Sequence, residues 1–181
     1  MLKCNEVIGL PVIDSKQGVK MGAVKDVLFD IKTRKLKGIL IEQNGCELKK
    51  KVIEKDNILS LGRDAVVVTE HSCIKKMSNG EFKKRFGKKN SVRGYKIFSD
   101  SGDELGAVRD ILFDFEYGIM EGVEITDGIM QDIIEGRNVI PLIGNVEFGK
   151  DQMIVGKQSL EEMISSGKGL KKLFGGSEQR Q

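Results

Sequence analysis

The sequence predicts a mainly β protein that consists of two tandem, small six-stranded β-barrels, each followed by a short helical tail. Three observations lead to this prediction. A nine-residue stretch occurs twice, as GAVKDVLFD at 22–30 and as GAVRDILFD at 106–114. The apolar residues come in short runs rich in Val, Ile, Leu and Phe, separated by Gly, Asp and Asn, which is typical of short strands. The chain has 181 residues, enough for two units of about 80 to 90 residues each.

The duplication extends well beyond the nine-residue stretch. Matched positions follow at an offset of 84 residues and, after a short insertion, at an offset of 87 residues. These pairs are Gly18 with Gly102, Gly38 with Gly122, Val52 with Val139, Gly62 with Gly149 and Val68 with Val155. The tails correspond as well, with Ser-Asn-Gly at 78–80 and Ser-Ser-Gly at 165–167. The repeated unit therefore contains both a barrel and its tail.

Six strands are expected in each copy. In the first copy they are predicted near 7–13, 22–31, 36–42, 46–54, 57–61 and 65–69. The dipeptides Asn44-Gly45 and Asp127-Gly128 favour two-residue hairpin turns. Because unpaired edge strands invite aggregation, so small a sheet is best closed into a barrel.

A barrel of this size is filled by its own side chains, which leaves little room for a buried ligand. The inward residues predicted for the first copy are Val24, Leu28, Ile39, Ile41, Val52, Leu59 and Val67. A self-filled barrel disfavours an enzyme that acts on a small molecule.

The predicted domain limits follow from the repeat. The first barrel spans 1–76, a basic helical linker 77–91, the second barrel 92–157, and a helical tail with a disordered end 158–181. Each tail contains a Ser-x-x-Glu sequence, at Ser78 and at Ser159. This spacing predicts a helix start at which two side chains satisfy backbone donors reciprocally.

The net charge of +3 conceals an asymmetry between the halves. Residues 1–90 carry 20 Lys and Arg against 11 Asp and Glu, a balance of +9, whereas residues 91–181 carry 10 against 16, a balance of −6. The candidate basic binding surface consists of Lys32, Arg34, Lys35, Lys37, Lys49, Lys50, Lys51, Lys83, Lys84 and Arg85. A solvated surface is one interpretation, and a contact surface for RNA or an acidic protein is the other.

No catalytic residue is expected. The repeated aspartates are the most catalytic-looking groups, but four residues of strand separate Asp26 from Asp30 by about 13 Å, too far for a shared proton. The pair Asp110 and Asp114 repeats this spacing. Asp30 and Asp114 are instead expected to accept backbone hydrogen bonds at a strand end and turn.

No metal or cofactor is expected either. His71 with Cys4, Cys46 and Cys73 makes up the ligand inventory of a zinc site, but no two cysteines are paired at zinc-knuckle spacing. Reduced thiols are predicted. The glycines form no phosphate-binding loop.

The cytoplasm is the expected compartment, because the sequence has no apolar run of about 18 residues and no secretory signal at its start. The apolar and basic segment at 171–174 leaves two alternatives. Packing of the tail against a barrel is favoured over contact with a membrane surface.

The strongest repeated pattern resembles the PRC-barrel family. Its residues here are Gly22, Asp26, Phe29, Asp30 and Gly38 in the first copy, with Gly106, Asp110, Phe113, Asp114 and Gly122 in the second. That family includes the C-terminal domain of the ribosome-maturation factor RimM and the cytoplasmic domain of the photosynthetic reaction-centre H subunit. The resemblance covers almost the whole chain and implies a six-stranded barrel in which these ten residues serve the fold. It also implies an adaptor that binds other macromolecules, without a catalytic residue set.

The sequence thus predicts a non-enzymatic binding or scaffolding module. A protein-interaction adaptor that uses the outer surfaces of two barrels is the first hypothesis, with another protein as partner. The alternative is an RNA- or ribosome-associated factor that binds through the basic first half. The sequence leaves open whether the basic and acidic halves pair within the chain, and in which oligomeric state the protein exists.

Overall fold

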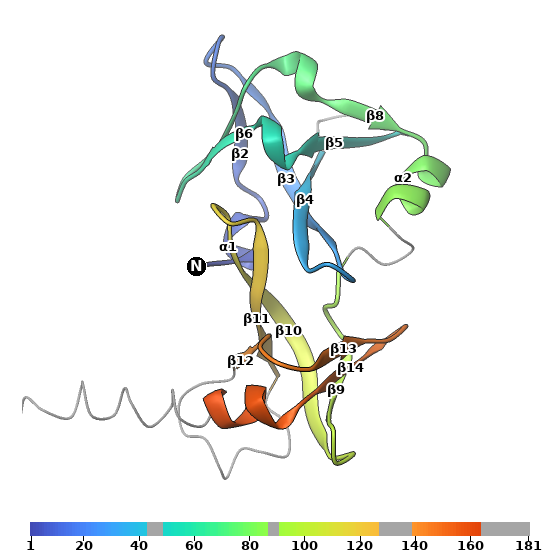
Figure 1. Ribbon diagram of the computed structural model, residues 1–181. Coiled ribbons are helices and arrows are strands. Elements are labelled where there is room, and N and C mark those ends of the chain that lie inside the picture. The colour runs from blue at the N-terminus through green and yellow to red at the C-terminus, as the bar shows by residue number, and fades with distance from the viewer. Residues whose placement is uncertain (43–48, 87–90, 127–138, 164–181) are drawn as a thin grey trace, which may run out of the picture. The chain divides into compact units, whose positions relative to one another are not determined.

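The computed structural model describes residues 1–42, 49–86, 91–126 and 139–163. Its contacts divide the chain into two compact units (Figure 1). The first unit comprises Met1–Val92 together with Leu112–Met120. The second unit comprises Arg93–Ile111 and Glu121–Gln181.

The first repeat forms a curled sheet with the strand order β6-β7-β2-β3-β4-β5, and β8 pairs with β5. Its elements are β1 (Leu2–Lys3), α1 (Cys4–Val7), β2 (Pro11–Asp14), β3 (Lys20–Asp30), β4 (Lys35–Glu42), β5 (Lys50–Glu54), η1 (Lys55–Asn57), β6 (Ile58–Leu61), β7 (Val66–Val68), η2 (His71–Cys73), β8 (Lys75–Met77) and α2 (Asn79–Phe86). The strands β2 and β7 run parallel, whereas the pairs β2–β3, β3–β4, β4–β5 and β6–β7 are antiparallel. Only the three-residue η1 joins β5 to β6, so the two ends of this strand order must come close together and the sheet must curl.

The second repeat has the same strand order, β13-β14-β9-β10-β11-β12. Its strands are β9 (Lys96–Ser99), β10 (Glu104–Asp114), β11 (Ile119–Ile125), β12 (Val139–Pro141), β13 (Val146–Phe148) and β14 (Gln152–Val155). Here too one pair, β14 with β9, is parallel. The predicted fold class, a mainly β chain with a six-stranded sheet in each repeat, is confirmed.

The first predicted strand, 7–13, is wrong in its extent. Residues Cys4–Val7 form the short helix α1, and the strand β2 begins only at Pro11. The Glu6 carboxylate accepts a hydrogen bond of 3.0 Å from the Lys3 backbone N–H, which stabilises this turn at its start. The predicted hairpin dipeptides at 44–45 and 127–128, and Cys46, lie outside the described residues.

The core confirms most of the predicted inward residues, but not all. Val24, Ile39 and Ile41 are buried. Leu28 and Val52 are also buried, in a cluster beneath α2 whose other members are Leu40, Met77, Phe82 and Phe86. Val67 is half-buried, and the Leu59 side chain is wrongly predicted, since it is 56% exposed. Its neighbour Ile58 faces the core, and alternation along β6 then turns Leu59 outward.

One of the two predicted helix starts is confirmed. The Ser78 N–H donates to Glu81 Oε2 (2.7 Å), and the Glu81 N–H donates to Ser78 Oγ (3.3 Å), directly before and within α2. The corresponding prediction at Ser159 is wrong, because the helix there already begins at residue 157. The Ser159 hydroxyl donates instead to the Ile143 carbonyl oxygen at 2.7 Å. The rest of the predicted tail, including 171–174, lies outside the described residues.

The end of the hairpin formed by β10 and β11, residues 112–120, belongs to the first unit. The Leu36 N–H donates to the Gly118 oxygen (2.8 Å), and the Met120 N–H donates to the Arg34 oxygen (2.9 Å). Leu36 and Met120 are matched positions of the two repeats, 84 residues apart, and so are Arg34 and Gly118. The two hydrogen bonds therefore form a symmetric pair. Phe29 and its counterpart Phe113 pack edge to face, with ring centroids 5.5 Å apart. By sequence this segment falls within the predicted second barrel, 92–157, yet its contacts are with the first repeat.

Candidate functional site

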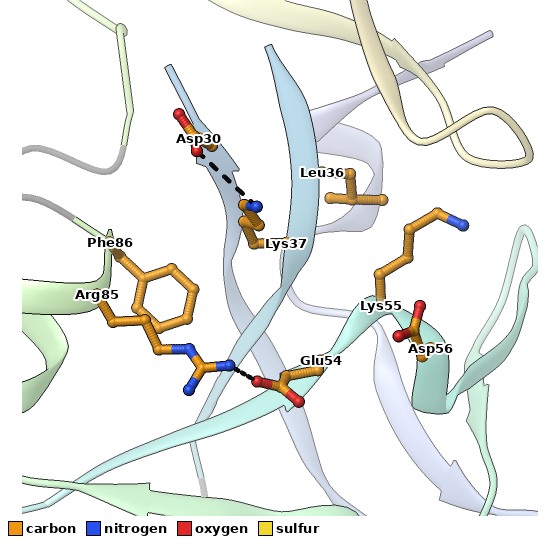
Figure 2. A pocket seen from close by; sticks show the side chains of 8 residues that line it. All are labelled: Asp30, Leu36, Lys37, Glu54, Lys55, Asp56, Arg85 and Phe86. Carbon is orange, nitrogen blue, oxygen red and sulfur yellow. Dashed lines mark hydrogen bonds and ion pairs between the residues drawn. The ribbon is translucent and has the colours of Figure 1, made fainter. Parts of the chain in front are cut away.

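A charged cleft of about 410 Å³ opens on the first unit (Figure 2). Four segments contribute its walls: the end of β3, the start of β4, the junction of β5 with η1, and the end of α2. Its side chains are Asp30, Leu36, Lys37, Glu54, Lys55, Asp56, Arg85 and Phe86. Figure 2 shows Arg85 and Phe86 on one side of the cleft and Lys55 and Asp56 on the other.

A glycine allows the two strands at the base of the cleft to approach each other. Gly38 follows Lys37 on β4 and is paired with Glu54 on β5. A Cβ atom at Gly38 would lie 2.1 Å from the Ile53 carbonyl oxygen, and its φ is +152°. No larger residue fits there without moving one strand. The repeated glycine therefore sets the spacing on which Lys37 and Glu54 depend.

Asp30 ends β3 and holds the following turn. Its Oδ1 accepts the N–H groups of Lys32 (3.1 Å) and Thr33 (3.2 Å), and its Oδ2 lies 3.8 Å from the Lys37 ammonium. The hydrogen bond from the Thr33 backbone, aided by the Lys37 charge, lowers the pKa of the Asp30 carboxyl below its ordinary value. Asp114 also holds a turn in the second repeat, where its Oδ1 accepts the Tyr117 N–H at 2.8 Å. The predicted role of these two aspartates as acceptors at a turn is confirmed.

Glu54 connects β5 to β8 and α2. Its carboxylate accepts a hydrogen bond of 2.5 Å from the Lys75 ammonium of β8 and forms an ion pair with the Arg85 guanidinium of α2. The hydrogen bond from Lys75, with the charge of Arg85, lowers the pKa of Glu54 despite its partial burial. A carboxylate shared between two cations keeps a partner if one of them turns away.

Lys55 is positioned by the hairpin end 112–120. Its ammonium lies 5.3 Å from the centroid of the Phe115 ring, a cation–π geometry. A Cβ atom at Gly118 would lie 2.6 Å from Cε of Lys55, so the lysine side chain runs directly over the glycine. In the part of the chain that the structure describes, neither Lys55 nor the neighbouring Asp56 is in an ion pair.

The cleft is suited to binding charged groups rather than to transferring protons. A general acid or base that works near neutral pH needs a pKa close to the working pH. The carboxyl groups of Asp30 and Glu54 are shifted the opposite way, to lower pKa. They remain ionised and engaged with cations.

The predicted basic surface is divided among three places, and one of its residues is buried. Lys37 and Arg85 line the cleft. Lys32, Arg34 and Lys35 lie in and beside the turn from β3 to β4. Lys51 is only 4% exposed, which makes it a poor contact for an external anion.

The remaining basic residues make up what we call the basic ridge. The ridge consists of Lys49, Lys50, Lys83 and Lys84. Lys76 is not part of it, because the pairing of β5 with β8 sets Lys76 opposite Lys51, on the face of the sheet away from Lys50. The Lys50 ammonium lies 5.9 Å from the ring centroid of Phe82 on α2, which brings the helix with Lys83 and Lys84 beside the strands.

Sequence reasoning missed the cleft residues Leu36, Glu54, Lys55 and Asp56. One signal could have found the three charged ones. They form a charged triplet at the end of one strand and in the turn after it, whereas the second repeat, at an offset of 87 residues, has Pro141, Leu142 and Ile143. Of these, Leu142 is buried.

Among the residues that the structure describes, no helix is both long enough and apolar enough to cross a bilayer. The same residues contain no group of three or more His, Cys, Asp or Glu side chains arranged to hold a metal ion. Cys4 and Cys73 are both buried.

Comparison with known proteins agrees with the duplicated fold. The family model of the PRC-barrel domain matches residues 1–72 and again residues 87–157, which correspond to the two repeats. The chain belongs to the PRC-barrel family. It is similar to "Uncharacterized protein YrrD" of Bacillus subtilis (strain 168), with 25% identity over 154 residues that cover 84% of this chain and 86% of the relative.

Proposed function

We propose that the protein is a non-enzymatic, protein-binding adaptor that uses the outer surfaces of its two barrels, and that the charged cleft is the docking site of the first barrel. One observation carries the proposal. The two repeats share their strand order, yet Glu54, Lys55 and Asp56 at the cleft correspond to apolar residues in the second repeat. One framework thus presents two unlike surfaces, as an adaptor with two partners requires.

The chemistry of the cleft supports binding over catalysis. Its lowered carboxyl pKa values favour fixed charges, and ion pairs hold those charges in place. Fold membership alone assigns no function, because function depends on the individual site. Docking is therefore inferred from the residues of the cleft and not from family membership.

Site-specific photo-crosslinking in the native cell tests this proposal. A photoreactive amino acid at Asp56, an exposed position that lines the cleft, should give a discrete adduct with one or a few proteins. The matched control is the same amino acid at Lys20, exposed on the first unit but outside the cleft. Indistinguishable adduct patterns at the two positions would count against docking at the cleft.

RNA binding is the second candidate, and the basic ridge favours it. Phosphate contacts by lysines make affinity fall steeply with salt. The triple substitution of Lys49, Lys83 and Lys84 by Gln should weaken RNA binding and flatten its salt dependence, by about 0.7 to 0.9 units of log–log slope for each phosphate that is no longer neutralised. Substitution of Lys20, Lys25 and Arg63 by Gln removes the same charge elsewhere on the first unit. RNA affinity that responds equally to both triple variants would refute a specific role for the ridge.

A further inference from the structure

We infer that the occupant of the charged cleft is an acidic segment of a partner protein, whose carboxylates pair with Arg85 and Lys55. This inference rests on the proposed function, because it names the chemistry of the partner that docks at the same cleft. It goes further by specifying that the partner's docking segment is acidic. It excludes basic segments and nucleic acids from this site.

Arg85 can exchange its carboxylate partner at little cost. Its side chain is 54% exposed, and its ion pair with Glu54 belongs to a class of surface pairs that contribute little to stability. If Arg85 turns to an incoming carboxylate, Glu54 keeps its hydrogen bond of 2.5 Å with Lys75. The partly buried Glu54 carboxylate therefore stays paired. The planar guanidinium can donate two parallel hydrogen bonds to the new carboxylate.

Lys55 offers a second cation across the cleft, already held in place. Its methylene groups lie against Gly118 and its ammonium lies over Phe115. An ordered side chain loses less conformational freedom when it binds. Since Lys55 has no ion-pair partner among the described residues, an incoming carboxylate need not displace one.

The charge around the cleft favours acidic groups. Exposed lysines stand near the ends of the same segments, namely Lys32 and Lys35 beside the turn that follows Asp30, and Lys83 and Lys84 on α2 before Arg85. The carboxylates of Asp30 and Glu54 are engaged by Lys37 and Lys75. A positive surrounding potential attracts an acidic partner and speeds its association.

The carboxylate of Asp56 favours a protein segment over a nucleic acid. Asp56 stands beside Lys55 without an ion pair among the described residues, and it would repel a chain that carries a negative charge at every unit. A peptide can place carboxylates at Arg85 and Lys55 and an uncharged residue opposite Asp56.

Fluorescence anisotropy with the full-length protein tests the inference. The probes are three labelled decamers: a peptide of alternating glutamate and leucine, a peptide of alternating lysine and leucine, and decauridylate. The variants are Lys55→Gln and Arg85→Gln, with Lys20→Gln as the control that removes equal charge outside the cleft. The glutamate peptide should bind most tightly. Its affinity should fall about tenfold with each cleft variant, the effect of removing one charge-assisted hydrogen bond, and less than about twofold with Lys20→Gln.

The outcomes separate this inference from the proposed function. An equal loss with Lys20→Gln would overturn the acidic segment, as would tighter binding of the lysine peptide, or tighter binding of decauridylate that Lys55→Gln and Arg85→Gln weaken. The inference would also be overturned if no peptide bound while the protein adducts at Asp56 persisted. Docking at the cleft would remain supported in that case. If those adducts are missing as well, the docking function itself fails.

Discussion

The first repeat has Glu54, Lys55 and Asp56 at the end of β5 and in the turn after it, where the second repeat has Pro141, Leu142 and Ile143. The strand order on both sides of this difference is the same. Positions that hold the strands together have been kept in both copies, such as the aspartate that ends the long strand and the glycine that lets two strands approach. Comparison of the repeats thus separates residues that serve the fold from residues that distinguish one surface from the other.

The largest effect is expected where counterparts from the two repeats touch. Phe29 and Phe113 are both fully buried and pack edge to face. Substitution of either by Ala should lower the free energy of unfolding by about 4 kcal/mol. The double variant should cost about 1 kcal/mol less than the sum, because the attraction between the rings is removed only once.

Chemical denaturation of the single and double variants, followed by circular dichroism, measures this coupling. Strict additivity would mean that the two rings do not interact in solution. The loss of stability in each single variant would then come from the other contacts of that ring.

A smaller, unequal effect is expected at the matched glycines. A Cβ atom would lie 2.1 Å from a backbone oxygen at Gly38 but 3.2 Å from one at Gly122. Gly38→Ala should therefore destabilise the protein by about 3 kcal/mol and Gly122→Ala by about 1 kcal/mol. Equal losses in urea unfolding would show that the two strand pairs are equally close.

The smallest effect concerns pH and belongs to the first repeat alone. The pKa of Glu54 lies below its ordinary value of 4.5, so its stabilising contribution is present above that value and is lost as pH falls through the folded-state pKa. Glu54→Gln should be about 1 kcal/mol less stable than the parent at pH 7. That difference should shrink as pH falls below about 4.5.

Unfolding free energies measured from pH 7 to pH 3 provide the test. Glu161→Gln is the control in the second unit, where Glu161 forms an exposed pair with Lys157 at 3.5 Å. A gap between the Glu54→Gln variant and the parent that stays constant down to pH 3 would contradict the assignment.

Most of the strand pattern was predictable because it depends on local sequence and occurs in both repeats. Alternation and turn residues place β3 and β4, and Asp30 and Asp114 accept turn hydrogen bonds as their positions at strand ends suggest. The helix α1 was missed because four residues show no helical periodicity, and its formation depends on burying Cys4 and Val7. Leu59 was misplaced because burial on a short strand depends on register, which one residue of shift inverts.

The candidate site was predictable only in its parts. Lys37 and Arg85 were candidates for their charge, and Asp30 for its repeated motif. Nothing local shows that Glu54 meets Arg85, 31 residues later, because that contact depends on how α2 packs over the sheet. The burial of Lys51 is likewise a tertiary effect that composition does not reveal.

The symmetric exchange of hydrogen bonds between Arg34–Leu36 and Gly118–Met120 has an evolutionary consequence. Contacts made from equivalent positions across a local dyad are of the kind that identical molecules make in a homodimer. An ancestor with one repeat would meet the same geometric conditions when two of its molecules came together. Fusion of the two genes makes such a contact intramolecular, so it no longer depends on protein concentration. Each repeat can then change its own contact residues, as Lys35 opposite its counterpart Ile119 illustrates.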